Sequence, residues 1–145
     1  MAVAWELSHS VETDASPVTA WNYWTNIANW SDPPAEFELD RPFAVGSQGV
    51  TRMPGQAPMH WVIREVNPPD TAKIEMQLEG ATFSSQWRFE GLADGRTRLT
   101  PRVELEGENA GAYISQLDST FRISLPEGMK KIAAAMASFE AGHAG

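Results

Sequence analysis

The order of apolar and polar residues predicts strands over most of the chain. In the stretch 3–11, large apolar residues recur at alternate positions, which is the period of a half-buried strand. Similar stretches cover 37–39, a segment after the turn at Gly46 and Gly49, 59–66, 73–79, 83–90 and 98–106. The last three carry charged residues on their second face, as in an antiparallel sheet with one side in water. We therefore expect a curved antiparallel sheet of six or seven strands.

Towards the C-terminus the period changes to that of a helix. Apolar residues recur at steps of three and four and form one stripe: Ile114, Leu117, Phe121, Leu125, Met129, Ile132, Met136 and Phe139. Pro126 lacks a backbone donor, so a kink or break is expected near residues 122–126. The stripe should cover the apolar face of the sheet. The pattern thus predicts an α+β fold in which the sheet curls around a long C-terminal helix.

Two short helices are expected after the first strand. Ser16 is a candidate N-cap, and Pro17 fits a first helical turn. Trp21 and Trp24 follow at a spacing of three, so they share a helical face and should be buried as packing residues. The Asp-Pro-Pro sequence at 32–34 is expected to end the second helix.

Length and composition narrow the class of protein. The chain has 145 residues and no cysteine, with 19 acidic against 11 basic side chains and a formal charge of −8. A single domain, 1–145, is the expected organisation. An acidic surface without a Lys/Arg cluster disfavours nucleic-acid binding, and no apolar stretch reaches the roughly 20 residues that cross a membrane. The N-terminus shows no secretory signal, so we expect a cytoplasmic protein. We expect it to be a monomer or homodimer.

Aromatic residues are the most informative part of the composition. Six tryptophans and six phenylalanines either fill a core or line a pocket for a flat apolar ligand. Alternation and the helical stripe place one set on the facing surfaces of sheet and helix. This predicted ligand-binding set is Trp61, Met76, Phe83, Ser85, Trp87, Tyr113, Leu117 and Phe121. The small Ser85 either leaves room for a ligand or hydrogen-bonds neighbouring backbone.

In the stretch 59–66 the inward phase is ambiguous. One phase contains His60 and Arg64 together with two valines, and the other contains Trp61 and Ile63. The second phase is favoured as inward, and a bulge would switch the phase midway. If the first were inward, His60 and Arg64 could polarise a carbonyl or hold a carboxylate.

Candidate catalytic chemistry is sparse. His9 is in phase with the apolar positions of the first strand, where it is either an acid or base or a satisfied core residue. The sequence has no Gly-x-Ser-x-Gly motif and no Gly-rich phosphate loop. The three histidines, His9, His60 and His143, form no local ligand pair. Neither a metal nor a cofactor is therefore expected.

Five motifs occur in an informative order. They are Ser16-Pro-Val-Thr-Ala-Trp21-Asn-Tyr-Trp24 with Ile27 and Trp30; Arg41-Pro-Phe43 with Gly46 and Gly49; Glu65-Val66-Asn67-Pro68-Pro69; Trp87-Arg-Phe-Glu90 before Gly95-Arg-Thr-Arg-Leu-Thr100; and Gly128-Met129 with Ile132. Together they resemble the START/pollen-allergen-like helix-grip superfamily (SRPBCC). The nearest subgroup looks like the bacterial polyketide cyclase/dehydrase-like proteins. The resemblance implies the helix-grip fold, whereas members differ in function.

Three functions are compatible with these observations. The first is binding of a hydrophobic or aromatic small molecule in an internal cavity, as the lipid-transport members imply. The second is an aromatase/cyclase-type enzyme that folds a polyketide and assists aldol closure and loss of water. The third is an interaction module similar to the activator of the Hsp90 ATPase, which an apolar patch outside any cavity would favour.

Overall fold

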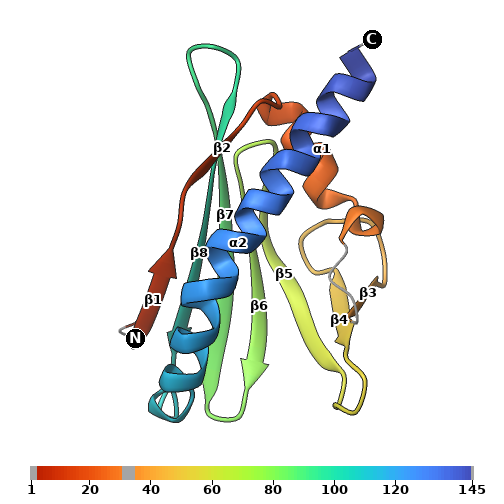
Figure 1. Ribbon diagram of the computed structural model, residues 1–145. Helices are drawn as coiled ribbons and strands as arrows, with labels where there is room; N and C mark the ends of the chain where they lie inside the picture. Colours follow the sequence, from red (N-terminus) through yellow and green to blue (C-terminus); the bar gives the residue numbers. More distant parts are fainter. Residues whose placement is uncertain (1–2, 31–34, 145) are drawn as a thin grey trace.

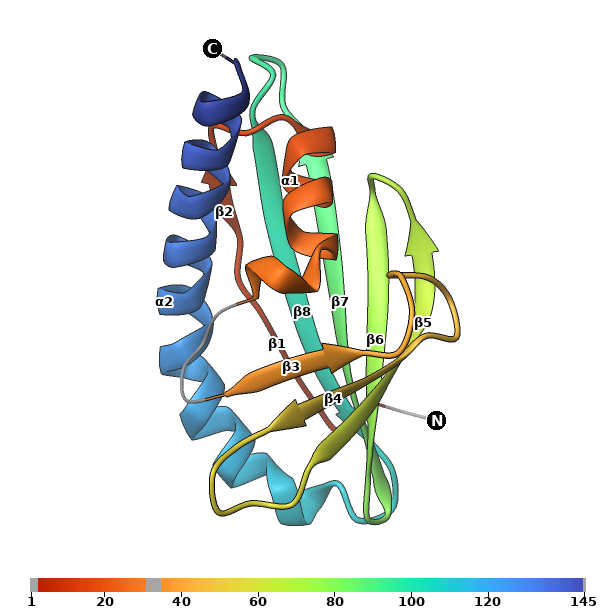
Figure 2. The same ribbon diagram turned by 90° about the vertical axis from the view of Figure 1, so that its right-hand side faces the viewer.

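Eight antiparallel strands form one curved sheet, and a long helix, α2 (Gly111–Ala144), crosses its concave side (Figures 1 and 2). The computed structural model describes residues 3–30 and 35–144. The strands are β1 (Trp5–Ser8), β2 (Val11–Thr13), β3 (Glu36–Leu39), β4 (Gln48–Arg52), β5 (Met59–Asn67), β6 (Thr71–Leu78), β7 (Ala81–Gly91) and β8 (Thr97–Glu106). Their order is β1-β8-β7-β6-β5-β4-β3, and β2 also pairs with β8. This is the expected α+β helix-grip architecture.

The sheet has one strand more than the sequence predicts because the first strand is divided. Trp5 pairs with Leu105 and Val11 pairs with Leu99, so the register on β8 is the same on both sides of the division. At the division, the amide of His9 donates to the carbonyl of Pro101 over 3.3 Å. The reciprocal bond cannot form because Pro101 has no N–H. The single predicted strand therefore becomes β1 and β2.

A bulge in β5 explains the ambiguous phase of that strand. The register against β6 shifts between Ile63 and Glu65. Before the shift, Trp61 and Ile63 are 6% and 0% exposed, whereas His60 and Arg64 are exposed. The favoured phase is correct, and His60 and Arg64 do not face the interior.

The two short helices lie at the end of the molecule where α2 ends (Figure 2). α1 (Pro17–Thr25) begins at Ser16, whose Oγ accepts from the Thr19 amide over 3.3 Å, and η1 (Ile27–Asn29) follows. Trp21 and Trp24 are buried, as predicted. The stretch 32–34, where the sequence predicts the end of the second helix, lies outside the described residues.

The helix α2 continues through Pro126, so of the expected kink or break, the break does not occur. Proline removes one hydrogen bond from the ladder, but the helix is held against the sheet on both sides of this position. Towards its C-terminal end, Thr13 Oγ1 donates to the carbonyl of Ala133 over 2.7 Å. Towards its N-terminal end, Trp5 Nε1 donates to Asp118 Oδ1 over 3.0 Å.

The core includes two clusters at opposite ends of α2. The α1 cluster contains the buried residues Ala15, Ala20, Trp21, Trp24, Ala72, Phe89, Leu99, Met129, Ala133 and Met136. The β7 cluster contains the buried residues Ala81, Leu105 and Ala110, with Tyr113, Leu117 and Phe83 packed against them. The middle of the helical stripe, at Phe121 and Leu125, is only half-buried. Of these two, Leu125 packs against the α1 cluster, and Phe121 belongs to neither cluster.

Candidate functional site

Cross-strand register brings most of the predicted set together on the concave face. Trp61 pairs with Met76, and Met76 pairs with Phe83. Ser85 and Trp87 follow Phe83 at alternate positions of β7, so all three share one face. From α2, Phe121 stacks on Phe83 with ring centroids 5.5 Å apart and an interplanar angle of 22°.

The predicted helix residues at the start of α2 belong to the β7 cluster. Leu117 and Tyr113 pack beside Phe83 there. The hydroxyl of Tyr113 donates to the carbonyl of Glu79 over 3.0 Å, at the turn between β6 and β7. Tyr113 thus lies at one end of the concave face, and its hydroxyl already has a hydrogen-bond partner within the protein.

At the other end, four indoles form a continuous row. Trp87 stacks on Trp24 at 4.7 Å and 24°, Trp24 lies 6.1 Å from Trp30, and Trp30 stacks on Trp61 at 5.6 Å and 28°. Trp87 and Trp61 are therefore joined through Trp24 of α1 and Trp30, the residue after η1. The row closes the concave face on the side of the short helices.

The surroundings of Trp61 include residues that sequence patterning did not select. The Trp61 indole N–H donates to Thr51 Oγ1 over 3.0 Å, and its ring covers Gly49, its partner in the register of β4 and β5. Trp30 packs against the same ring and against Phe37. A glycine opposite a tryptophan in a hairpin was the available sequence signal for this contact.

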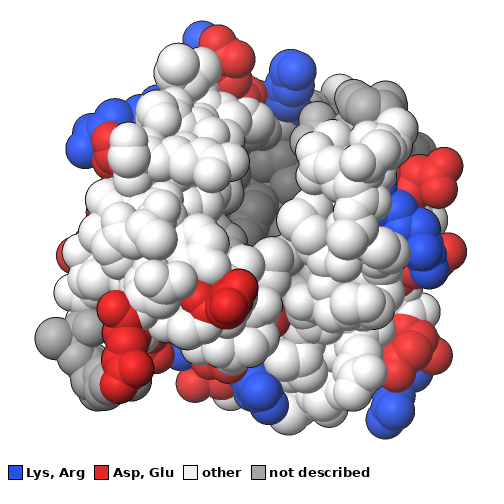
Figure 3. Space-filling view, turned by 90° about the horizontal axis from the view of Figure 1, so that it is seen from below, with Lys and Arg blue, Asp and Glu red and all other residues white. Residues whose placement is uncertain are grey.

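Between the indole row and the β7 cluster, the concave face remains partly open. Ser85, Trp87 and Met76 are only half-buried, as is Phe121 opposite them. Seen from below, the molecule is hollowed between two masses of predominantly uncharged surface (Figure 3). Among the described residues, the side chains in the apolar middle of the fold thus keep part of their surface accessible.

The edge of this region carries one charged contact. Asp118 on α2 accepts from Arg122 Nε over 2.7 Å and from Trp5 Nε1 over 3.0 Å. The hydrogen bond from Arg122 and that from Trp5 hold the pKa of Asp118 below its usual range. This carboxylate connects α2 to β1 and is already neutralised by Arg122.

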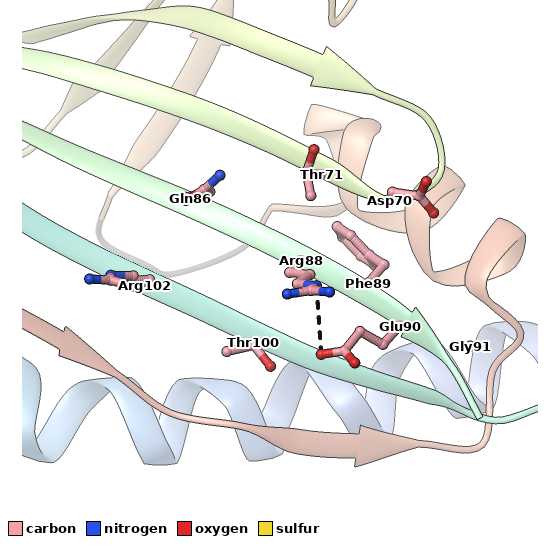
Figure 4. Close-up of a pocket in the computed structure, with 9 residues that line it drawn as sticks. All are labelled: Asp70, Thr71, Gln86, Arg88, Phe89, Glu90, Gly91, Thr100 and Arg102. Atoms are coloured by element: carbon pink, nitrogen blue, oxygen red, sulfur yellow. Dashed lines mark ion pairs between the residues drawn. The ribbon is translucent and has the colours of Figure 1, made fainter.

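A separate hollow of about 610 Å³ lies on the outer face of the sheet (Figure 4). Its lining residues are Asp70, Thr71, Gln86, Arg88, Phe89, Glu90, Gly91, Thr100 and Arg102. Arg88 is 3.7 Å from Glu90, and Arg102 pairs with Glu6 and Glu104. Both arginines of this hollow are thus paired with carboxylates, and the hollow lies on the face opposite to the predicted set.

A smaller hollow of about 290 Å³ lies between β2 and α2. It is bordered by Val11, Glu12, Thr13, Asp14, Arg96, Lys130, Ala133, Ala134 and Ala137. Arg96 donates to Asp14 and to Glu12, each over 2.8 Å. The two carboxylates raise the pKa of Arg96. This hollow contains none of the predicted set either.

Metal and membrane sites have no support in the described part of the chain. Among residues 3–30 and 35–144, no three His, Asp or Glu side chains gather in a way that could hold a metal ion. Within the same ranges, no helix has both the length and the apolar run of a membrane span.

Comparison with protein families gives one match that covers almost the whole chain. The family described as polyketide cyclase / dehydrase and lipid transport matches residues 4–137. Comparison with curated proteins found no match.

Solved structures with the same fold come from plants and bacteria. Norcoclaurine synthase from Thalictrum flavum, in complex with dopamine and hydroxybenzaldehyde, superposes with a TM-score of 0.71 at 13% identity, over 96% of this chain and 87% of that one. A protein from Nitrosomonas europaea reaches a TM-score of 0.73 at 12% identity, over 94% and 96%. A protein from Arthrobacter aurescens reaches 0.64 at 17% identity, over 94% and 86%. At these identities the likeness concerns the fold alone.

Proposed function

Because this chain belongs to the polyketide cyclase / dehydrase and lipid transport family, we propose that it binds an apolar, planar small molecule between sheet and helix. One observation carries the proposal. Phe121 on α2 and Met76 on the facing strand β6 are half-buried and belong to neither core cluster. Exposed apolar surface in a concave place is typical of a ligand site.

The predicted set supplies suitable walls for such a ligand. Phe83 and Phe121 offer stacked rings on one side, and Trp87 and Trp61 end the indole row on the other. Ser85 lies on β7 between Phe83 and Trp87 and has the smallest side chain of the three. Aromatic walls with few polar groups favour a flat apolar molecule.

The test is titration with a panel of aromatic polyketides, flavonoids and fatty acids, followed by tryptophan fluorescence. In Ser85→Trp, a bulky side chain occupies the proposed site, so binding should be lost while the circular dichroism stays unchanged. Ser84→Trp is the matched control, because Ser84 pairs with Glu75 and Glu104 on the outer face and should leave binding intact. Equal binding by wild type and a folded Ser85→Trp would exclude this site.

A second candidate is an enzyme that closes and dehydrates a polyketide chain. The family description favours it, and so does His9, which is in phase with Trp5 and Leu7 and pairs with Pro101 next to Trp87. His9 could move a proton while a carbon–carbon bond forms and water leaves. Incubation with a linear poly-β-ketone should then yield a product lighter by one water, and His9→Gln should slow its formation. If the poly-β-ketone binds but no lighter product forms, the enzyme candidate is excluded and the proposed binding function remains.

We also propose that the protein acts in the cytoplasm, as a monomer or homodimer. Support for the compartment is the absence of cysteine, since the chain does not use the disulfides that an oxidising compartment allows.

If no ligand in the panel binds the wild type, an interaction module becomes the better description.

A further inference from the structure

The concave face of the sheet carries no fixed charge. The inward-facing strand positions are all occupied by apolar residues, glycine, serine or threonine. They are paired across the sheet from Trp5 and Leu105 through Phe83 and Met76 to Trp61 and Gly49. None of them is Asp, Glu, Lys or Arg. Of the residues in phase with them, only His9, at the division between β1 and β2, is titratable in the described part of the sheet.

Near the proposed ligand-binding set, the helix adds no free charge to this face, whereas Lys130 borders the separate hollow beside β2. Asp118 is the charged residue of α2 that contacts the inner surface, through Trp5, and its second oxygen accepts from Arg122. A ligand cation would have to compete with that guanidinium. A ligand anion would meet no free Lys or Arg from the strands. A charged ligand group would therefore lose its water without gaining a partner, which is strongly unfavourable in an apolar site.

Within the described part of the chain, one hydroxyl on the same face has no hydrogen-bond partner. Thr13 donates to the carbonyl of Ala133, Thr97 to that of Ala15, and Thr51 accepts from Trp61. Ser85 has no hydrogen bond among the described residues, although it is half-buried between Phe83 and Trp87. No buried side-chain polar atom in the described part of the chain lacks a hydrogen-bond partner, so the Ser85 hydroxyl is accessible to solvent. A ligand that fills this place would displace water from the hydroxyl, which favours a ligand that supplies a hydrogen-bonding atom instead.

We propose that the interior selects uncharged ring compounds with an oxygen acceptor, and that Ser85 donates the hydrogen bond to that oxygen. This inference rests on the proposed small-molecule binding and specifies its ligand class. Apolar rings stack on the aromatic walls, the oxygen binds Ser85, and carboxylates are rejected by the absence of a counter-charge.

The experiment uses three naphthalenes of similar size and isothermal titration calorimetry with the full chain. 2-Acetylnaphthalene is neutral with an oxygen, 2-ethylnaphthalene is neutral without one, and 2-naphthoate is an anion. We expect the acetyl compound to bind about 3- to 10-fold more tightly than the ethyl compound, the range of one hydrogen bond. Naphthoate should bind at least about 100-fold more weakly than the acetyl compound.

Variants separate the parts of the inference. Ser85→Ala should remove the preference for the acetyl over the ethyl compound, while Ser84→Ala on the outer face should keep it. His9→Gln should leave the weak affinity for 2-naphthoate unchanged, because His9 does not act as the counter-ion of the carboxylate. Naphthoate binding within 10-fold of the acetyl compound, or an unchanged preference in Ser85→Ala, overturns this inference and leaves the proposed function standing. If none of the three binds the wild type, the proposed function fails as well.

Discussion

The indole of Trp61 lies so close to Gly49 that a Cβ built on this glycine would fall 2.2 Å from the ring. The ring also stacks on Trp30 and donates to Thr51. It therefore fills space that a side chain would normally occupy, and one end of the concave face depends on a glycine at this position.

Gly49→Ala should destabilise the protein by about 1–3 kcal/mol, because the buried ring must leave its position and its hydrogen bond. Urea unfolding measures the loss, and tryptophan emission should shift. Gly128→Ala is the matched control, since nothing lies within 4 Å of its added Cβ and alanine is favoured in a helix; it should stabilise by about 0.5–1 kcal/mol. Equal stability of Gly49→Ala and wild type would mean that the ring moves at no cost.

Trp24→Ala should cost about 3–5 kcal/mol, the usual range for truncating a buried large aromatic. Trp24 is 3% exposed and contacts five other rings: Trp21, Trp30, Phe43, Trp87 and Phe89. Val18→Ala, on the exposed side of the same helix, should stay within about 0.5 kcal/mol of wild type. A loss below about 1 kcal/mol for Trp24→Ala in urea would show that this residue is not core.

Pro126→Ala should stabilise the protein by about 1–3 kcal/mol. The helix runs through this position without a break, so the new amide can complete the ladder that proline interrupts. Pro17→Ala is the control, because at the start of α1 the missing donor has no helical partner to lose. Thermal unfolding should give a higher midpoint for Pro126→Ala alone; a lower midpoint would mean that the proline relieves a constraint elsewhere.

The ion pair of Asp118 and Arg122 should make stability depend on acid pH. The pKa of Asp118 is lowered in the folded protein, chiefly by the hydrogen bond from Arg122. The contribution of the ion pair to the stability of the folded protein is therefore present above the unfolded pKa of about 4. It is lost as the pH falls below that value. The difference in melting temperature between wild type and Asp118→Asn should shrink from pH 6 to pH 3. Glu127→Gln removes an exposed charge from the same helix and is the control, for which the difference in melting temperature should show no such trend.

Sequence patterning alone determined the elements and the faces of most of them. Alternation over 73–79, 83–90 and 98–106 identified β6, β7 and β8, because residues two apart on a strand necessarily share a face. The apolar stripe identified α2 in the same way. These periods arise from local backbone geometry, so no tertiary information was needed. The same reasoning placed Phe83, Ser85 and Trp87 on one inner face.

Tertiary structure decided the features that depend on a neighbouring strand or helix. The division of the first strand follows from Pro101 on β8, and the change of phase after Ile63 from a bulge against β6. The helix passes Pro126 although proline disfavours it, because packing against the sheet outweighs a local preference. The stacking of Trp87 on Trp24 and of Trp61 on Trp30 joins segments far apart in the chain. The periodicity of a strand or helix determines on which side of that element a side chain lies. Which residue it contacts there depends on how elements distant in the sequence pack together.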